Sequence, residues 1–150
     1  MTQVSNIPYD DLQVGQKATF SSGVEERDVQ LFAAVSRDHN PVHLDAEFAA
    51  KTMFKERIAH GMFSGALISA AIAREMPGPG TIYLSQTLRF KAPVRAGDTV
   101  RATVTVKEVF VEKNRVTLET VCTVGGRVVI EGEAVMMPPS KNAVLTGTAP

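Results

Sequence analysis

The chain has 150 residues, of which 44% are hydrophobic, so it has the size and apolar content of one globular domain with a single core. Lysine plus arginine and aspartate plus glutamate number 16 each, which leaves no field of one sign for a nucleic-acid backbone or an anionic bilayer. The single cysteine, Cys122, lies in an alternating apolar stretch and excludes an internal disulfide or a thiolate metal cluster.

The amino terminus resembles no targeting signal, since residues 1–8 have neither a basic start nor an apolar run. The longest weakly polar stretch, residues 58–73, is shorter than the roughly 20 residues that cross a bilayer. We therefore expect a cytoplasmic protein with neither a membrane nor a nucleic acid as partner.

The first half of the chain predicts short elements joined by loops. A strand over residues 17–24 is followed by a helix over residues 25–35 with an acidic first turn. The inward positions expected on this helix are Val29, Leu31, Phe32 and Val35. A second short helix is predicted over residues 45–52, with Asp45 as its N-cap and Phe48 turned inward.

The second half predicts one long helix and four strands. The helix, residues 61–76, is apolar nearly all round, so it must be covered by protein on several sides. Strands are predicted over residues 81–90, 99–109, 115–124 and 127–136, and the last three form an antiparallel meander. The order indicates an α+β domain over residues 1–137, an antiparallel sheet wrapped around a long central helix. Residues 138–150 are expected to form a disordered tail.

A carboxylate and an imidazole, Asp38 and His43, stand five residues apart around Pro41. An imidazole has an unperturbed pKa near 6.5, so His43 suits a group that takes and returns protons near neutral pH. Asp38 can hold and polarise the same water. The backbone N–H of Gly61, at the start of the long helix, is a candidate donor to a developing oxyanion.

The same segment also has a purely structural interpretation as a capping turn. Asn40 would be an N-cap, Pro41 would occupy the first helical position, and Asp38 would bind loop amides. Spacing alone favours this interpretation over catalysis.

A metal site is a further alternative, because His39 and His43 are four residues apart with other ligand types nearby. Pro41 between them opposes a shared helical face, so no metal is expected. His39 is then a solvated loop residue, and His60 caps or packs at the entrance of the long helix.

Three motifs in a fixed order carry a resemblance over residues 10–137. They are Asp38-x-Asn40-Pro41-x-His43-Leu44-Asp45, then Ile58-Ala59-His60-Gly61-Met62, then Arg89-Phe90-x-x-Pro93-Val94-x-x-Gly97-Asp98. In this combination the chain resembles the (R)-specific enoyl-CoA hydratases, the MaoC-like branch of the hot-dog fold.

The resemblance implies a homodimeric hot-dog enzyme that adds water to a trans-2-enoyl-CoA and gives the (R)-3-hydroxyacyl product. In its terms Asp38 and His43 activate one water, Asn40 orients the motif, and the Gly61 amide binds the thioester carbonyl. Ser69 and Ile72 on the long helix are candidates to line the acyl pocket. No metal or redox cofactor is implied, and the pathway suggested joins fatty-acid β-oxidation to polyhydroxyalkanoate storage.

Other functions remain open on the sequence. A dehydratase of (R)-3-hydroxyacyl groups on acyl carrier protein would use related chemistry. A hot-dog thioesterase and a non-catalytic acyl-binding module are the other classes. The basic residues Arg89, Lys91 and Arg95 could meet coenzyme A phosphates or form a solvated edge. Ser64 and Ser69 lack the glycine elbow of a serine nucleophile.

Overall fold

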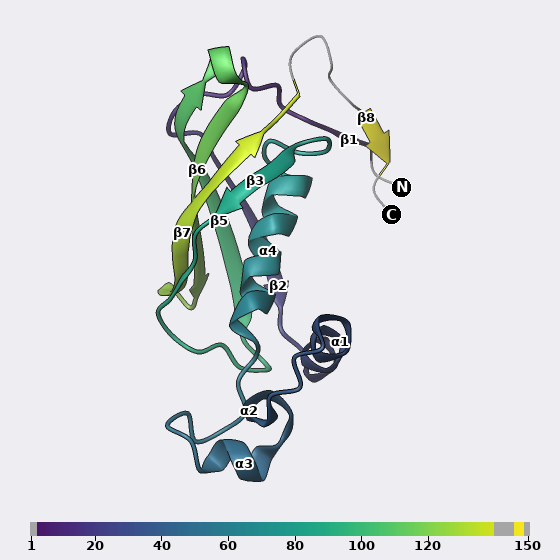
Figure 1. Ribbon diagram of the computed structural model, residues 1–150, viewed down its shortest axis with the longest axis vertical. Helices are drawn as coiled ribbons and strands as arrows, with labels where there is room; N and C mark the ends of the chain where they lie inside the picture. Colours follow the sequence, from purple (N-terminus) through teal and green to yellow (C-terminus); the bar gives the residue numbers. More distant parts are fainter. Residues whose placement is uncertain (1–2, 140–145, 149–150) are drawn as a thin grey trace.

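The computed structural model, which describes residues 3–139 and 146–148, packs a six-stranded sheet against one long helix (Figure 1). The strands of this sheet are β2 Lys17–Gly23, β3 Ile82–Gln86, β4 Arg89–Phe90, β5 Thr99–Phe110, β6 Arg115–Val124 and β7 Arg127–Met137. Their order is β2-β5-β6-β7-β3, with β4 also on β7, and all pairs are antiparallel. The predicted α+β architecture, with its antiparallel sheet around a long helix, is confirmed.

The meander β5-β6-β7 forms as the turn residues predict. β5 ends in the short 3-10 helix η1, Val111–Lys113, and Asn114 then takes a φ of 52° before β6 begins. Between β6 and β7, Gly125 and Gly126 have φ values of 55° and 82°, a backbone that residues with a Cβ adopt at a cost.

The strand predicted over residues 81–90 is divided into β3 and β4. Thr87, between them, is held to β7 by two bonds, since its N–H donates to the Glu133 oxygen at 2.8 Å and its hydroxyl accepts from the Glu133 N–H at 3.0 Å. A Cβ built on Gly132 would lie 1.8 Å from the Thr87 oxygen. The break therefore forms at a close backbone approach that only glycine allows.

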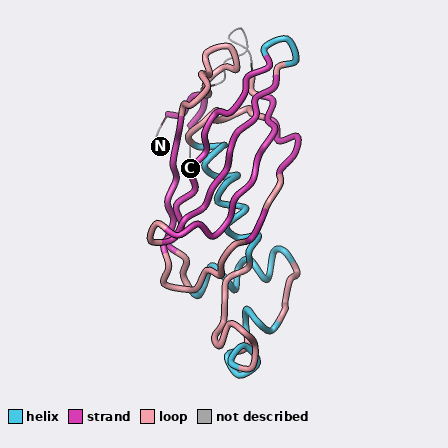
Figure 2. The backbone as a smooth tube through the Cα atoms, turned by 90° about the vertical axis from the view of Figure 1, so that its left-hand side faces the viewer, coloured by secondary structure: helices cyan, strands magenta, loops and turns pink. Residues whose placement is uncertain are grey.

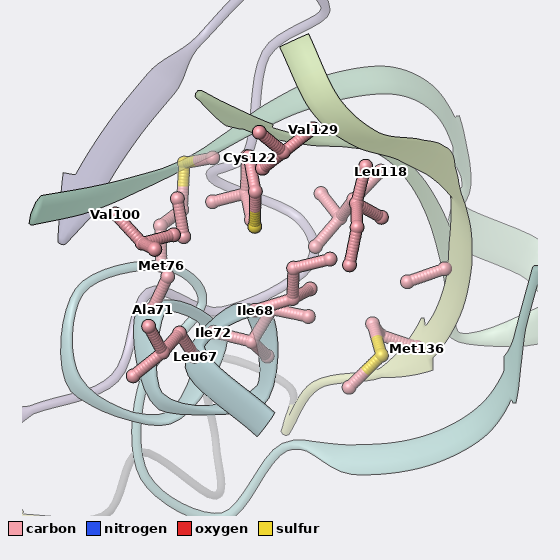
Figure 3. Close-up of a cluster of buried hydrophobic side chains, with 14 of the residues drawn as sticks. Leu67, Ile68, Ala71, Ile72, Met76, Val100, Leu118, Cys122, Val129 and Met136 are labelled. Carbon is pink, nitrogen blue, oxygen red and sulfur yellow. The ribbon is translucent and has the colours of Figure 1, made fainter. Parts of the chain in front are cut away.

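The core lies between the sheet and helix α4, Gly61–Arg74, which runs along one side of the strands (Figures 1 and 2). Side chains of α4 and of the sheet meet there, as Figure 3 shows for Ile68, Ala71, Leu118 and Met136. Cys122 of β6 is fully buried, and its thiol lies 3.6 Å from the Ser64 backbone oxygen of α4. α4 ends at Arg74, two residues before the predicted end.

One face of α4 is uncovered, contrary to the prediction that protein wraps this helix on several sides. Met62 is 55% exposed, and Ala66, Ser69 and Ala73, which follow at helical spacing, are also exposed. The sheet of a single chain reaches only the opposite side of the helix.

The helices α1 Glu26–Ser36, α2 Pro41–Leu44 and α3 Ala46–Ala50 gather beyond one end of the sheet (Figure 1). The predicted N-cap at Asp45 is confirmed, since its carboxylate accepts the Phe48 N–H at 3.0 Å.

Three predicted inward positions on these helices are wrong. Leu31 is 64% exposed, Val35 77% and Phe48 45%. The face of α1 that packs on protein holds the buried Val29 and Ala33 and the half-buried Phe32, because nothing in the described chain covers its other sides.

Beyond the main sheet, β1 Gln3–Ser5 pairs with β8 Thr146–Thr148. The predicted disorder of the tail concerns residues that mostly lie outside the described ones, 140–145 and 149–150, and it stays a prediction. In the part of the chain that is described, no helix combines the length and apolar character needed to span a membrane.

Candidate active site

Asn40 and Pro41 build the turn that holds the candidate acid–base pair. The Asn40 side-chain oxygen accepts the Val42 N–H at 3.1 Å, and Pro41 is the first residue of α2. The Asn40 N–H in turn donates to Asp38 Oδ1 at 3.1 Å. The capping role expected for Asn40 and Pro41 is therefore confirmed, and it brings Asp38 beside the helix that carries His43.

His43 is fixed by a hydrogen bond to the following loop. Its side chain is 9% exposed, and Nδ1 lies 2.8 Å from the Ile58 backbone oxygen. A carbonyl oxygen only accepts, so Nδ1 carries the proton and Nε2 keeps its lone pair. This Nε2 lies 4.0 Å from Asp38 Oδ2, whose side chain is 51% exposed.

The pKa of His43 is lowered from 6.5, first by burial and then by the neighbouring His60, against the opposite effects of the Ile58 hydrogen bond and the Asp38 charge. His43 is consequently a neutral imidazole at pH 7, with a lone pair able to accept a proton. Asp38 supplies the adjoining negative charge from a solvent-accessible position.

His60 joins both members of the pair. Its Nε2 donates to the Asp38 backbone oxygen at 3.0 Å, and its ring stacks on that of His43 with centroids 3.8 Å apart. The sequence predicts capping or packing for His60. Packing is confirmed. His60 also occupies the N-cap position of α4, where its backbone oxygen accepts the Phe63 N–H at 3.0 Å and its side chain makes no cap hydrogen bond.

Asp38, His43 and His60 each offer a possible metal-ligand atom, all within 4.8 Å of one another. An imidazole binds an ion through a lone pair in the plane of its ring, and zinc lies about 2.1 Å from the nitrogen. The two rings here are only 30° from parallel and stacked, so both lone pairs do not converge on one ion. The expectation of no metal stays a prediction, and this geometry supports it.

Gly61 is the first residue of α4, so its N–H has no partner within the helix. A Cβ at this position would lie 2.7 Å from the Phe90 ring, and glycine is therefore the residue that fits. Gly61 lines a mainly apolar cavity of about 450 Å³ together with Met53, Phe54, Met62, Phe90 and Ile130.

His43 and Gly61 border neighbouring cavities. His43 lines a second cavity, of about 410 Å³, and Ile58 borders both. Ser64, whose buried hydroxyl has no hydrogen-bond partner among the described residues, also lines the cavity at Gly61.

The two predicted acyl-pocket residues lie elsewhere on α4. Ser69 is on the uncovered face of the helix, and Ile72 is 2% exposed in the core. Neither borders the two cavities described above. Their role in an acyl pocket stays a prediction.

The basic residues near β4 are paired with acids. Lys91 Nζ lies 3.4 Å and Arg89 3.9 Å from Glu131, and Arg95 forms an ion pair with Glu56. Lys91 also borders the cavity at Gly61.

Comparisons with known proteins all point to the same family. Residues 10–132 match the family described as MaoC like domain. An (R)-specific enoyl-CoA hydratase of Rhodospirillum rubrum is 52% identical over 133 residues, covering 89% of this chain and 92% of that protein. An (R)-specific enoyl-CoA hydratase of Aeromonas caviae is 46% identical and covers 85% of this chain and 96% of that protein.

Solved structures agree with the sequence relatives. The unliganded R-hydratase PhaJ1 of Pseudomonas aeruginosa superposes with a TM-score of 0.92 at 57% identity, covering 99% of this chain and 95% of that one. The (R)-hydratase of A. caviae involved in PHA biosynthesis gives 0.82 at 45% identity, over 85% of this chain and 98% of that one. By the family match, the identities and the shared hot-dog fold, this chain belongs to the MaoC-like family.

Proposed function

We propose that the protein is an (R)-specific enoyl-CoA hydratase, which adds water to a trans-2-enoyl-CoA to give the (R)-3-hydroxyacyl-CoA. The observation that carries this proposal is the 4.0 Å approach of His43 Nε2 to Asp38 Oδ2, with a lone pair on the nitrogen. Two hydratases with 46% or more identity over most of the chain support the same reaction.

The gap between the two atoms suits one water molecule. A water about 2.8 Å from each of two acceptors that are 4.0 Å apart subtends about 90° at its oxygen, near its own bond angle. Such a water donates one hydrogen to His43 Nε2 and the other to Asp38. Its remaining lone pairs are free to attack a carbon.

The proposed reaction proceeds by addition to the conjugated double bond. The water oxygen bonds to the β-carbon while His43 or Asp38 takes its proton, and the π electrons move onto the thioester oxygen. The Gly61 N–H donates to this oxyanion. Return of a proton to the α-carbon completes the product, so no proton or electron is left over and no cofactor belongs to the proposal.

Asn40 belongs to the proposed site as an orienting residue. Its side chain caps α2 and its N–H binds the Asp38 carboxylate, so it fixes both ends of the acid–base segment. Ser69 and Ile72 are proposed to line the acyl pocket of the assembled enzyme and not to contact the reacting atoms.

The protein is further proposed to work as a homodimer. β3 is the last strand of the sheet, and its outer edge pairs with no strand among the described residues. Ile82, Tyr83 and Leu84 on this strand are 51%, 37% and 43% exposed, and the uncovered face of α4 begins with the exposed Met62. A second copy that joins β3 to β3 would cover the open edge and this apolar surface.

A carrier-protein substrate is the second candidate. A mitochondrial 3-hydroxyacyl-[acyl-carrier-protein] dehydratase of Arabidopsis thaliana is 34% identical, over 86% of this chain. The hydratases are more similar, so coenzyme A is the proposed carrier. A cytoplasmic location is part of the proposal, and cell fractionation tests it.

The experiment that tests the function follows the absorbance of the conjugated enoyl thioester after purified protein is added to crotonyl-CoA, with chiral analysis of the product. We expect rapid loss of absorbance and the (R)-alcohol. Asp38→Asn and His43→Ala should each reduce kcat by roughly a hundred- to ten-thousand-fold, the usual contribution of general acid–base groups.

The matched control is His39→Ala, because His39 lies in the same segment with an exposed side chain. This variant should retain wild-type turnover. A folded wild-type protein that leaves crotonyl-CoA and longer enoyl-CoA unchanged but acts on enoyl-acyl carrier protein would establish the second candidate. Release of free thiol without hydration would indicate a thioesterase, and binding without turnover an acyl-binding module.

A further inference from the structure

His60 occupies an unusual place for a polar side chain. It stands immediately before α4 and is 2% exposed, and its side chain makes no hydrogen bond to the helix that it precedes. Burying an imidazole costs free energy unless its polar atoms are bound. His60 binds one of them outside its own helix, to Asp38.

The two contacts of His60 fall on the two members of the acid–base pair. Its Nε2–H donates to the backbone oxygen of Asp38 at 3.0 Å, which fixes the chain at the carboxylate. Its ring lies on that of His43, with centroids 3.8 Å apart and planes 30° apart.

Stacking limits rotation of the His43 ring. The hydrogen bond from Nδ1 to Ile58 holds one edge of that ring, and rotation about this edge would turn Nε2 away from Asp38. The lone pair of Nε2 lies in the ring plane, so its direction is set by the plane of the ring. The flat face of His60 blocks this rotation.

His60 is in turn held by aromatic side chains. Phe32 of α1 lies 5.0 Å from its ring at 55°, and Phe63 of α4 meets Phe32 edge to face at 5.8 Å. Offset and edge-to-face ring pairs of this kind stabilise a defined arrangement. The acid–base pair is thereby connected to the two helices that carry these rings.

We propose that His60 is a positioning residue for the hydration reaction, which sets the distance between Asp38 and His43 through one hydrogen bond and one ring stack. This role rests on the proposed hydratase function. His60 itself does not transfer protons, because its Nε2 proton is held by Asp38 and its buried Nδ1 has no partner in the described structure.

Three variants separate the two contacts. His60→Gln keeps an N–H donor for the Asp38 oxygen and loses the stack. His60→Phe keeps a flat ring and loses the donor. His60→Ala loses both, and His39→Ala and His39→Phe are matched controls at the exposed neighbouring histidine.

We expect His60→Ala to lower kcat by about a hundredfold, since misplacement of a catalytic group by about 1 Å has an effect of that size. The kcat of His60→Gln and of His60→Phe should each lie between that of His60→Ala and that of wild type. Each should be at least about threefold higher than the kcat of His60→Ala. KM should change less than about twofold in all three, because the His60 side chain is buried and lines neither cavity of the site. The histidine controls should match wild type.

The measurement is kcat and KM on crotonyl-CoA for each variant, beside thermal unfolding to confirm that each is folded. If kcat stays within threefold of wild type in folded His60→Ala, which loses both contacts, the positioning role is wrong while the hydratase function stands. If kcat falls equally in all three variants in proportion to lost stability, His60 is a packing residue only. A folded wild-type protein without hydratase activity would overturn the function and this role together.

Discussion

At the scale of single residues, the proposed active site depends on His43, whose protonation is controlled chiefly by burial. The pKa of His43 is lowered from 6.5 chiefly by desolvation, and only its neutral form has a lone pair for the water. We expect kcat/KM to be constant at neutral pH and to fall at acid pH with a midpoint below 6.5. A pH profile of kcat/KM on crotonyl-CoA measures this midpoint, and a midpoint above 7 would contradict the assignment.

The same pKa shift affects stability. The folded state binds the His43 proton more weakly than the unfolded chain, so folding is disfavoured once the unfolded histidine is protonated. The contribution of His43 is therefore fully present above pH 6.5 and declines as the pH falls through the lowered folded value. Urea unfolding of the wild type and of His43→Phe at several pH values measures this effect. The free energy of unfolding should fall less at acid pH in the variant than in the wild type.

Gly61 provides a second test at this scale. A Cβ at residue 61 would lie 2.7 Å from the Phe90 ring, so Gly61→Ala must displace that ring from the cavity wall. Overpacking of this kind costs about 1–3 kcal/mol of unfolding free energy. Chemical denaturation should show this loss, and Gly61→Ala with Phe90→Leu should recover part of it.

Gly23→Ala is the matched control for this substitution, since a Cβ at residue 23 would meet no atom within 4 Å. It should leave stability and activity near wild type. A Gly61→Ala protein as stable as Gly23→Ala would show that Phe90 moves freely.

At the scale of elements, two neighbouring N-caps should contribute equally to the stability of the protein and unequally to its activity. Asn40 caps α2 and Asp45 caps α3 through similar bonds of 3.1 and 3.0 Å. Replacing either by alanine should cost about 1 kcal/mol of unfolding free energy.

Of the two capped helices, only α2 carries His43. Asn40→Ala removes the cap of this helix and leaves the backbone N–H bond to Asp38 in place. We therefore expect Asn40→Ala to lower kcat at least tenfold and Asp45→Ala by less than threefold. Denaturation curves and initial rates on the two variants test this difference, and equal rates would remove Asn40 from the site.

Elements with local signals were predictable from the sequence, and those set by tertiary contacts were not. The meander, its glycine turn and the Asp45 cap follow from neighbouring residues and were found. The break at Thr87 depends on Gly132, which is distant in the chain. Leu31 and Val35 are exposed because no other described element packs on that side of α1.

The candidate site divides in the same way. Asp38, Asn40 and His43 share one short motif and the structure brings them together. The contact of His60 with His43 could not be predicted from the sequence, because the two rings meet only after α4 has packed on the sheet.

At the scale of the whole molecule, the open edge of β3 and the uncovered face of α4 should determine the oligomeric state. We expect Leu84→Lys, on the exposed β3, to shift the protein from dimer to monomer, because two copies of the charge would meet at the joined edges. Light scattering after size-exclusion chromatography measures the mass. Val111→Lys, with a 52% exposed side chain in η1, is the control that should remain dimeric. A dimeric Leu84→Lys would place the interface elsewhere.

The reactivity of the single thiol, Cys122, can be used to measure how often the folded protein unfolds. It is fully buried beneath α4, and burial raises its pKa to about 12, so hardly any thiolate exists near neutral pH and reagents cannot reach it. Alkylation must wait until the helix leaves the sheet. With no second thiol to confuse the signal, the labelling rate under native conditions would count global openings and yield the free energy of the folded state without denaturant.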